Sequence, residues 1–494
     1  MCGGSNGKGE SSLFTVRVTN QEVIAAVLPV QEHWLPFSNL DLLLPPIDVS
    51  VFFCYNNTNR MSFGSMLRSL KNALGQALVS YYAFAGEVVH INSMGEPELL
   101  CNNRGVDFVE VEADLHLQNL NFYNPDESIQ GKLVPIKKHG VLAIQFCYKN
   151  TSLSATYLKC GGIMVACTFD HRIADAYSAN MFLVSWAQIS RPIKPATLAP
   201  PCFRRSLLNP RRPLCIHPSL DDMYVPISIS PPPFEPEPDN SDSLISRIYY
   251  ITADQLCRMQ SLASSSSSLD HIKNRTKLES FSAFLWKMVA MAAASSSSTT
   301  TLTGDCGKRF VVKMGVVVDG RKRLSNCDQS KEATMNSYFG NVLSVPFGGK
   351  PVEDLVEKPL SWAAEEVHKF LDTAVTEEHF LELIDLVEEH RPTSALARIY
   401  SGNTADVGPA LVVSSGQRFS QSKIDFGWGK PMFGSYHFPW GDDTGYVMPM
   451  LSPKRNGDWV VYMHLLKGHI DFIKSKAAHV FKPLTWDYLN TQHY

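Results

Sequence analysis

Residues 163–175, IMVACTFDHRIAD, join a short apolar run to a pentapeptide that carries a histidine and an aspartate. The run from Ile163 to Cys167 is typical of a buried strand, and the residues after Asp175 have the apolar spacing of a helix. A loop that leaves the end of a buried strand can face a cleft. We therefore take His171 as the first candidate for chemistry.

Length, composition and charge limit the classes of protein to which the chain can belong. With 494 residues it is expected to contain more than one core, because single cores stop growing at about 250–300 residues. Its proportions of hydrophobic residues, 44%, and charged residues, 19%, are typical of a globular protein. The net charge of -3 disfavours nucleic acid as a partner. No run reaches the ~20 apolar residues that span a bilayer, so no membrane insertion is expected.

The cysteines indicate a reducing compartment. There are 11, with no CxxC pair, and an odd number cannot all pair within one chain. Free thiols and a cytoplasmic location are the resulting expectation.

Changes in composition divide the chain into four segments. Residues 1–12 lack the apolar region of a signal peptide and are expected to form a flexible leader. Two domains are expected at 13–190 and 244–494. The proline-rich stretch between them, 191–243, cannot continue a helix or an inner strand, so we expect an extended crossover linker.

Local periodicity within the two expected domains predicts an α+β fold. Strands are predicted at 49–55 and 310–318, where β-branched and aromatic residues gather. Helices are predicted at 67–78 and 278–288, where apolar residues recur every three or four positions. An Asn456-Gly457 step between two apolar runs predicts a hairpin.

The spacing of His171 and Asp175 leaves two interpretations open. If both lay in one helix they would share a face, as the ligands of a zinc ion can, but two ligands are too few and no HExxH or cysteine pair accompanies them. We therefore expect no metal. The other interpretation is a structural histidine beside a salt-bridged aspartate. GxSxG, SxxK, Walker A and GxGxxG motifs are absent, which disfavours serine hydrolases and dinucleotide-binding enzymes.

A second motif begins 250 residues after Asp175. It consists of Asp425, Phe426, Gly427, Trp428 and Gly429. Two glycines around an indole predict a tight turn with a large apolar anchor. Neither the carboxylate nor the indole needs a substrate to explain it. We interpret this motif as structural.

Together, HxxxD at 171–175 and DFGWG at 425–429 resemble the plant BAHD acyltransferase family. The resemblance covers essentially the whole chain and includes YYAFAG at 81–86, VDGR at 318–321 and YFGN at 338–341. It implies an α+β fold of two chloramphenicol acetyltransferase-like domains, with a channel between them and the histidine at its centre. It also implies a monomer that binds no cofactor and uses acyl-CoA as its cosubstrate.

The resemblance also implies roles for individual residues. His171 would act as the general base, for which an ordinary pKa near 6.5 is well placed. Asp175 would point away from the substrate and pair with Arg321, which shapes the site. Ser414 falls where hydroxycinnamoyl-shikimate transferases carry a threonine whose hydroxyl can donate to the oxyanion. Thr276 is a candidate for a CoA contact, with a helix cap as its alternative.

The segments 37–49, 168–187 and 425–441 look most like the coniferyl alcohol acyltransferase branch. This similarity predicts transfer of an acyl group, with acetyl as the expected one, to a phenylpropanoid alcohol in a channel without extra cationic side chains. Gly416 stands where the shikimate transferases carry a tryptophan, which predicts an acceptor side that is wider or differently shaped and argues against shikimate or quinate as acceptor.

Three alternatives remain open for the function. The first is hydroxycinnamoyl transfer to another alcohol, and the second is an internal acyl transfer that closes a coumarin lactone. The third is a non-catalytic partner of a fatty-acid elongation complex, although such relatives typically lack DFGWG.

Overall fold

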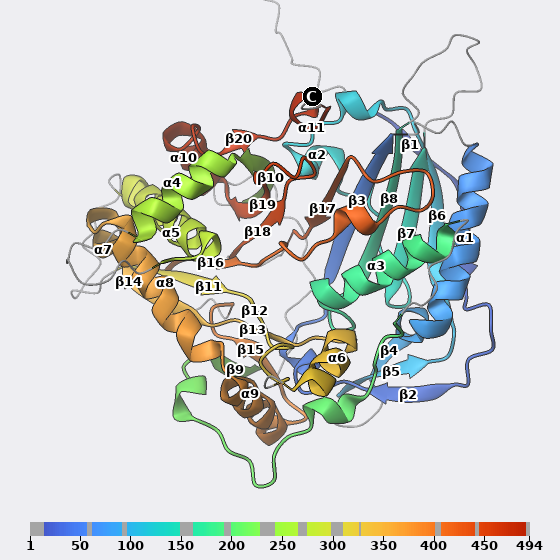
Figure 1. Cartoon of the computed structure of the whole chain (residues 1–494), viewed down its shortest axis with the longest axis horizontal. Coiled ribbons are helices and arrows are strands. Elements are labelled where there is room, and N and C mark those ends of the chain that lie inside the picture. The colour runs from blue at the N-terminus through green and yellow to red at the C-terminus, as the bar shows by residue number, and fades with distance from the viewer. Residues whose placement is uncertain are drawn as a thin grey trace, which may run out of the picture.

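The computed structural model describes the chain in eleven stretches: 14–56, 62–90, 96–148, 162–191, 199–227, 243–264, 274–297, 310–325, 328–400, 407–439 and 444–490. Two large twisted sheets dominate these residues, and each is covered by its own set of helices (Figure 1). The expected leader at 1–12 lies outside the described residues, as do 192–198 and 228–242 of the expected linker.

The first sheet has six strands and is drawn from both ends of the chain. Its order is β1 (Val16–Ile24), β6 (Val106–Ala113), β7 (Leu142–Tyr148), β8 (Gly162–Asp170), β3 (Asp48–Asn56) and β17 (Phe433–His437). β17 pairs antiparallel with β3, with Phe433 opposite Cys54. A strand from the last sixth of the sequence therefore completes a sheet whose other members come from the first third.

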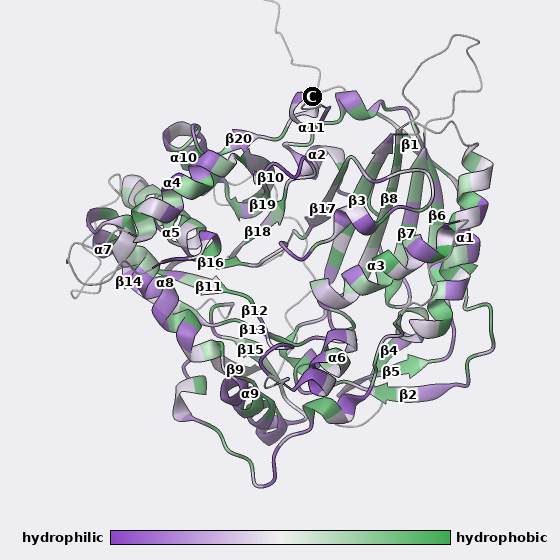
Figure 2. Cartoon of the chain, viewed as in Figure 1, coloured by the Kyte–Doolittle hydropathy of each residue, from purple (hydrophilic) through white to green (hydrophobic). Residues whose placement is uncertain are grey.

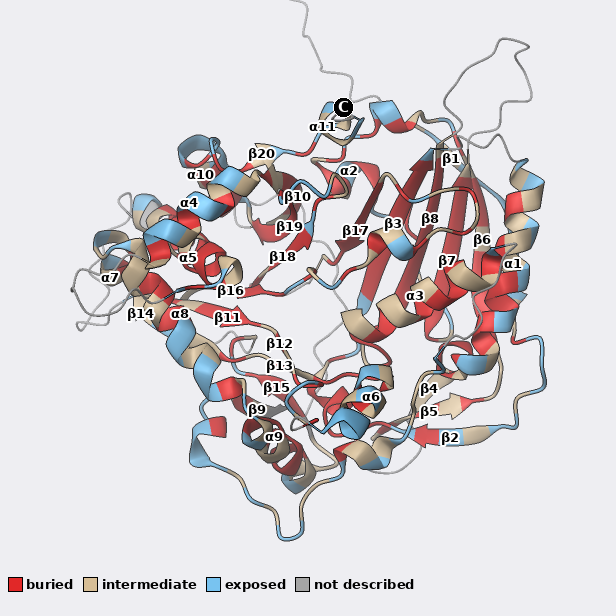
Figure 3. Ribbon diagram, in the orientation of Figure 1, coloured by how far each residue is buried: buried red, intermediate tan, exposed pale blue. Residues whose placement is uncertain are grey.

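Two helices, α1 (Phe63–Ser80) and α3 (Ala176–Ser190), lie together over one face of this sheet (Figure 1). The indole nitrogen of Trp186 in α3 donates to the carbonyl of Leu70 in α1 at 3.0 Å. β3 is buried from Val49 to Tyr55 (Figure 3), since helices cover one face of its sheet and residues 132–135 lie against the other, where the carbonyl of Pro135 accepts a hydrogen bond from Thr168 of β8 at 2.6 Å. Burial on both faces explains its unbroken apolar sequence.

The second sheet has seven strands. Their order is β14 (Phe347–Pro351), β11 (Val311–Val316), β16 (Val407–Val413), β18 (Gly445–Leu451), β19 (Trp459–Leu466), β10 (Leu244–Ile251) and β20 (Lys482–Pro483). α5 (Lys277–Ser297) runs through the middle of its helical layer. The other members are α4 (Ala253–Ser264), α7 (Val352–Glu357), α8 (Leu360–Ala374) and α10 (Lys467–Lys476). α8 shows the mixed hydropathy of a half-buried helix (Figure 2).

The described residues also form smaller elements outside the two large sheets and their helical layers. They are β2 (His33–Pro36), β4 (Glu87–His90), β5 (Pro97–Cys101), β9 (Tyr224–Ile227), β12 (Val318–Asp319), β13 (Leu343–Ser344), β15 (Ser394–Ala397), α2 (Pro125–Ser128), α6 (Gln329–Ser337), α9 (Glu377–His390), α11 (Trp486–Asn490), and short 3₁₀ turns at 41–43, 82–85, 117–119, 205–208, 218–220 and 421–423. The described part of the proline-rich segment includes two 3₁₀ turns and β9, which pairs with β15. Within the described stretches, no helix combines the length and apolarity needed to cross a membrane.

Candidate active site

His171 follows the last residue of β8, and Asp175 caps the next helix. The backbone N–H of His171 donates to the carbonyl of Ile47 at 2.9 Å. The Asp175 carboxylate accepts the N–H of Ser178 at 2.8 Å in the first turn of α3. The two residues therefore do not share a helix face, because a turn separates His171 from α3. Among the described residues no cluster of side chains suited to a metal ion occurs.

Asp175 is bound to Arg321 rather than to the imidazole. The guanidinium Nη1 lies 2.7 Å from Asp175 Oδ2, and Nη2 lies 3.2 Å from Oδ1. Both side chains are only 1% exposed. Arg321 also donates to the hydroxyl of Ser178 and to the carbonyl of Gly340, each at 3.0 Å. A bidentate ion pair this deep fixes α3 against the segment after β12.

Asn341 binds the loop that carries His171. No role for Asn341 was predicted from the sequence. Its Nδ2 donates to the backbone carbonyls of His171 and Arg172, each at 3.0 Å. Its backbone N–H donates at 2.7 Å to the carboxylate of Asp41, which is completely buried. The only signal in the sequence was the YFGN stretch, which carried a resemblance without a mechanism.

The surroundings of His171 favour its neutral form. Burial lowers the pKa of the imidazole below its ordinary 6.5, while its own backbone carbonyl and the carboxylates of Asp175 and Asp170 act in the opposite direction. The ring of Phe438 packs edge-on against it, with 6.3 Å between centroids. No hydrogen-bond partner for His171 Nδ1 occurs within the described part of the chain. A neutral imidazole can accept a proton at pH 7.

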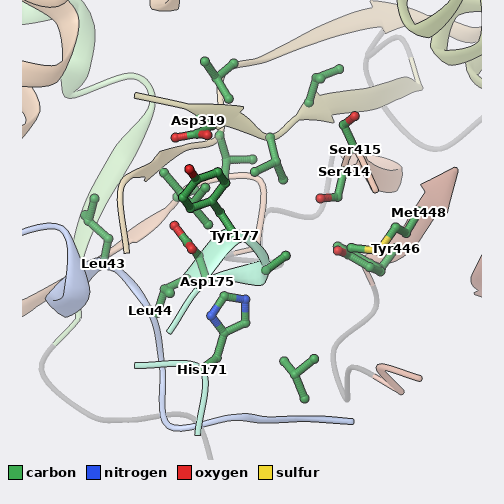
Figure 4. Close-up of a pocket in the computed structure, with 18 of the residues that line it drawn as sticks. Leu43, Leu44, His171, Asp175, Tyr177, Asp319, Ser414, Ser415, Tyr446 and Met448 are labelled. Atoms are coloured by element: carbon green, nitrogen blue, oxygen red, sulfur yellow. The ribbon is translucent and has the colours of Figure 1, made fainter. Parts of the chain in front are cut away.

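His171 opens into a pocket of about 360 Å³ between the two sheets (Figure 4). This volume lies within the range of small-molecule sites. His171, Asp175 and Tyr177 lie at one side of the pocket, and Ser414, Tyr446 and Met448 lie at the other (Figure 4). Most other lining residues are apolar, and they include Leu43, Leu44, Ile47, Val49, Phe169, Val316, Leu343 and Phe438.

Two arginines also line this pocket, contrary to the expected lack of cationic side chains. Arg418 pairs with Asp319 at 2.9 Å, so its charge is partly balanced. Arg323 is exposed. The composition of the sequence could not show that these two side chains meet at one site.

Ser414 and Gly416 lie on the wall formed by β16 and β18. The backbone of Ser414 continues the strand pairing by donating to the carbonyl of Val447 at 2.8 Å. Burial raises the pKa of Tyr446 to about 12, and a hydrogen bond with Ser414 acts against that rise.

Gly416 lines the pocket and is closely packed on its other side. A Cβ placed at Gly416 would lie 2.5 Å from Met450 Cγ and 3.3 Å from Met448 Cγ. The space beside this glycine is therefore filled by methionine side chains rather than open.

The DFGWG motif lies away from the residues that line the pocket. Gly427 and Gly429 have φ angles of +105° and +119°, which favour glycine. Their N–H groups donate to Asp425 Oδ1 at 2.8 and 3.0 Å. Phe426 packs against Trp428 and against Trp186 of α3. The motif is thus a self-bonded turn that anchors the segment before β17 to the first sheet's helical layer.

Thr276 caps α5 and is not among the residues that line the pocket. Its hydroxyl accepts the N–H of Glu279 at 3.2 Å, and the Glu279 carboxylate accepts the backbone N–H of Thr276 at 2.7 Å. This reciprocal arrangement is a capping box. The contact of Thr276 with CoA stays a prediction.

Comparison with known proteins places this site in a family. The sequence model described as Transferase family matches residues 14–480. The chain therefore belongs to that family, the BAHD acyltransferases, and is an acyltransferase rather than the non-catalytic partner considered above. Acyl-CoA is the cosubstrate of the family.

Curated relatives span several kinds of acyl transfer. The shikimate O-hydroxycinnamoyltransferase of Nicotiana tabacum is 26% identical over 457 residues, covering 90% of this chain and 95% of the relative. A hydroxycinnamoyltransferase of Narcissus pseudonarcissus is 28% identical, covering 82% and 86%. The (Z)-3-hexen-1-ol acetyltransferase of Arabidopsis thaliana is 26% identical, covering 85% and 84%.

Solved structures agree with the two-sheet fold. Vinorine synthase aligns with a TM-score of 0.66 at 19% identity, over 95% of this chain and 99% of its own. TRI101 of F. sporotrichioides, solved with coenzyme A and T-2, aligns with a TM-score of 0.70 at 13% identity, over 91% and 99%. The chain therefore shares its fold with these two solved structures.

Proposed function

We propose that this acyltransferase moves an acetyl group from acetyl-CoA to the primary alcohol of a phenylpropanoid such as coniferyl alcohol. The observation that carries the proposal is that His171, whose pKa is lowered by burial, opens into a pocket of about 360 Å³ with largely apolar and aromatic walls. A flat aromatic alcohol suits such walls, and its hydroxyl is the one group that must reach the base. The enzyme is proposed to act as a cytoplasmic monomer.

In the proposed reaction, His171 accepts the proton of the alcohol as the oxygen attacks the thioester carbonyl carbon. The carbonyl oxygen becomes an oxyanion, and Ser414 is proposed to donate a hydrogen bond to it. The carbon–sulfur bond then breaks, and the leaving thiolate of CoA takes the proton back from the imidazolium. Base catalysis of this kind contributes roughly 10²–10⁴-fold in rate.

Asp175 and Arg321 take no part in the proposed proton transfer. Their bidentate contact supports the role of a brace that keeps α3 and the histidine loop in place. Asn341 is proposed to act in the same way, since it binds the carbonyl of His171 itself.

Hydroxycinnamoyl transfer is the second candidate, and it is favoured by the activities for which the tobacco and Narcissus relatives are named. The pocket does not separate the two, because the aromatic walls would suit an aromatic acyl group as well as an aromatic acceptor. Internal acyl transfer to a coumarin would need the acyl-CoA alone.

A substrate matrix tests these candidates. Purified protein is incubated with acetyl-CoA, with p-coumaroyl-CoA or with a cinnamoyl-CoA that carries an ortho hydroxyl, each with coniferyl alcohol, with shikimate or with no acceptor, and free CoA and the ester or lactone product are measured. We expect the acetyl ester of coniferyl alcohol. Ester formation with p-coumaroyl-CoA but not with acetyl-CoA would establish the second candidate. Lactone formation without an acceptor would establish internal acyl transfer. CoA release no faster than that of His171→Ala in every mixture would refute the proposal.

A further inference from the structure

A chain of hydrogen bonds connects Phe438, beside the imidazole, to the second sheet. The backbone N–H of Phe438 donates to the hydroxyl of Tyr462 in β19 at 3.1 Å. That hydroxyl shares a hydrogen bond with Ser246 Oγ of β10 at 3.1 Å, and Ser246 Oγ lies 3.0 Å from His464 Nδ1. All of these side chains are buried. The segment just after β17, which belongs to the first sheet, is thus held by side chains of the second.

The ring of Phe438 lies between the catalytic candidate and a tyrosine of the opposite wall. Its centroid is 6.3 Å from that of His171, at 67°, and 5.0 Å from that of Tyr446, at 79°. Edge-to-face contacts at these distances are favourable. Phe438 also lines the pocket and is only 8% exposed. It therefore covers one side of the imidazole against water.

The hydroxyl of Tyr462 is a polar group at a fully buried position. Burial raises the pKa of Tyr462, which shows how poorly solvated the phenol is. The neighbouring His437, whose ring is 5.9 Å away, has neither ring nitrogen hydrogen-bonded within the described stretches. A phenylalanine would fill the same space without burying a polar group. The hydroxyl adds two directed contacts, the bond from the Phe438 backbone and the bond shared with Ser246 Oγ.

We propose that Tyr462 is a positioning residue for acyl transfer, which fixes Phe438 so that its ring covers His171 and excludes water from the imidazole. The inference rests on the proposed role of His171 as the base. Loss of the Tyr462 hydroxyl frees the Phe438 backbone, and water then reaches the imidazole. Because burial is what lowers the pKa of His171, hydration moves that pKa back up towards 6.5. The carboxylates of Asp170 and Asp175, which also face the ring, act in the same upward direction.

The test compares Tyr462→Phe with a matched control, Tyr249→Phe. Tyr249 is also fully buried in β10, and its hydroxyl bonds the hydroxyl of Tyr123 at 3.2 Å. Diethylpyrocarbonate labels neutral imidazoles, so the labelling of the His171 peptide, followed by mass spectrometry from pH 4.5 to 8, reports the pKa of that one residue. We expect the midpoint to rise by about half a unit or more in Tyr462→Phe and to stay unchanged in Tyr249→Phe. We also expect kcat/KM to fall roughly 10-fold in Tyr462→Phe.

A second variant, Phe438→Leu, keeps the proposal testable if Tyr462→Phe does not fold. It leaves the backbone bond to Tyr462 in place and removes the ring, so the same upward shift is expected. An unchanged His171 midpoint in the folded variants, even with reduced activity, would overturn the proposal and leave Tyr462 a purely structural residue. The labelling needs no turnover, so an inactive wild-type enzyme would refute the proposed function without deciding this inference.

Discussion

Arg321 binds both carboxylate oxygens of Asp175 across 146 residues of sequence, at 2.7 and 3.2 Å. Arg321 follows β12 near the second sheet, whereas Asp175 begins α3 over the first. The contact therefore joins the two halves of the molecule directly beneath the histidine loop. Both groups are desolvated, so neither can lose its partner without leaving a buried charge or an unfilled hydrogen bond.

Asp175→Asn is expected to lower the free energy of unfolding by about 3–5 kcal/mol, because it removes the buried counter-charge of Arg321 and leaves only the partly exposed Asp319, 3.3 Å from Nη1. Urea denaturation followed by tryptophan fluorescence measures this loss. Arg17→Gln, which breaks the exposed pair of Arg17 with Glu112, serves as the control and should barely move the transition. Equal midpoints for Asp175→Asn and wild type would show that the pair does not brace the fold.

The rate of acyl transfer is expected to depend on the neutral form of His171. As the pH falls through the pKa of the imidazole, the base becomes protonated and kcat/KM declines. Because burial lowers that pKa, the acid limb should have its midpoint below 6.5. His171→Ala should be roughly 10²–10⁴-fold slower and should lose this limb. The profile is measured by CoA release, with circular dichroism over the same range to exclude unfolding, and a midpoint above 6.5 contradicts the prediction.

Asn341→Ala is expected to release the histidine loop from its support. The carbonyls of His171 and Arg172 lose their donor, which should cost about 1–3 kcal/mol in stability. Displacement of the imidazole should also lower kcat roughly 10-fold. Asn102→Ala is a suitable control, since Asn102 makes side-chain hydrogen bonds to Glu87 and to the Arg104 backbone, away from the pocket. A variant that loses stability but keeps full kcat would limit Asn341 to a structural role.

Ser414→Ala tests the oxyanion donor. Loss of one such donor typically lowers kcat by about 10²–10³-fold, and KM should change little because the bond forms mainly in the transition state. Ser414→Thr retains a hydroxyl and should keep most of the activity. Turnover of Ser414→Ala at the wild-type rate would remove Ser414 from the mechanism.

Local patterns were sufficient to predict several elements. The apolar run at 49–55 became β3, the helical stripe at 67–78 became α1, and the stripe at 278–288 became part of α5. The Asn456-Gly457 turn joins β18 to β19, as expected for a hairpin, and Gly457 has a φ of +89°. These elements depend on side-chain periodicity and turn chemistry within a few residues, which a single sequence displays.

Features that depend on contacts between distant residues could not be predicted in this way. The pairing of β17 with β3 and the support of His171 by Asn341 each join positions far apart in the sequence. The close packing at Gly416 could not be predicted, because it depends on where the side chains of Met448 and Met450 point. His171 and Asp175 were predicted from a motif, but their separation onto a turn and a helix cap appears only in three dimensions.

The placement of β17 also has a consequence for synthesis on the ribosome. β3 ends at residue 56, yet its partner strand begins only at residue 433. Until then that edge of β3 is bare, and Phe438 cannot yet lie against His171. The nascent chain therefore cannot complete the first sheet until β17 has been made, and a chain truncated before residue 433 would expose an apolar strand edge prone to aggregation.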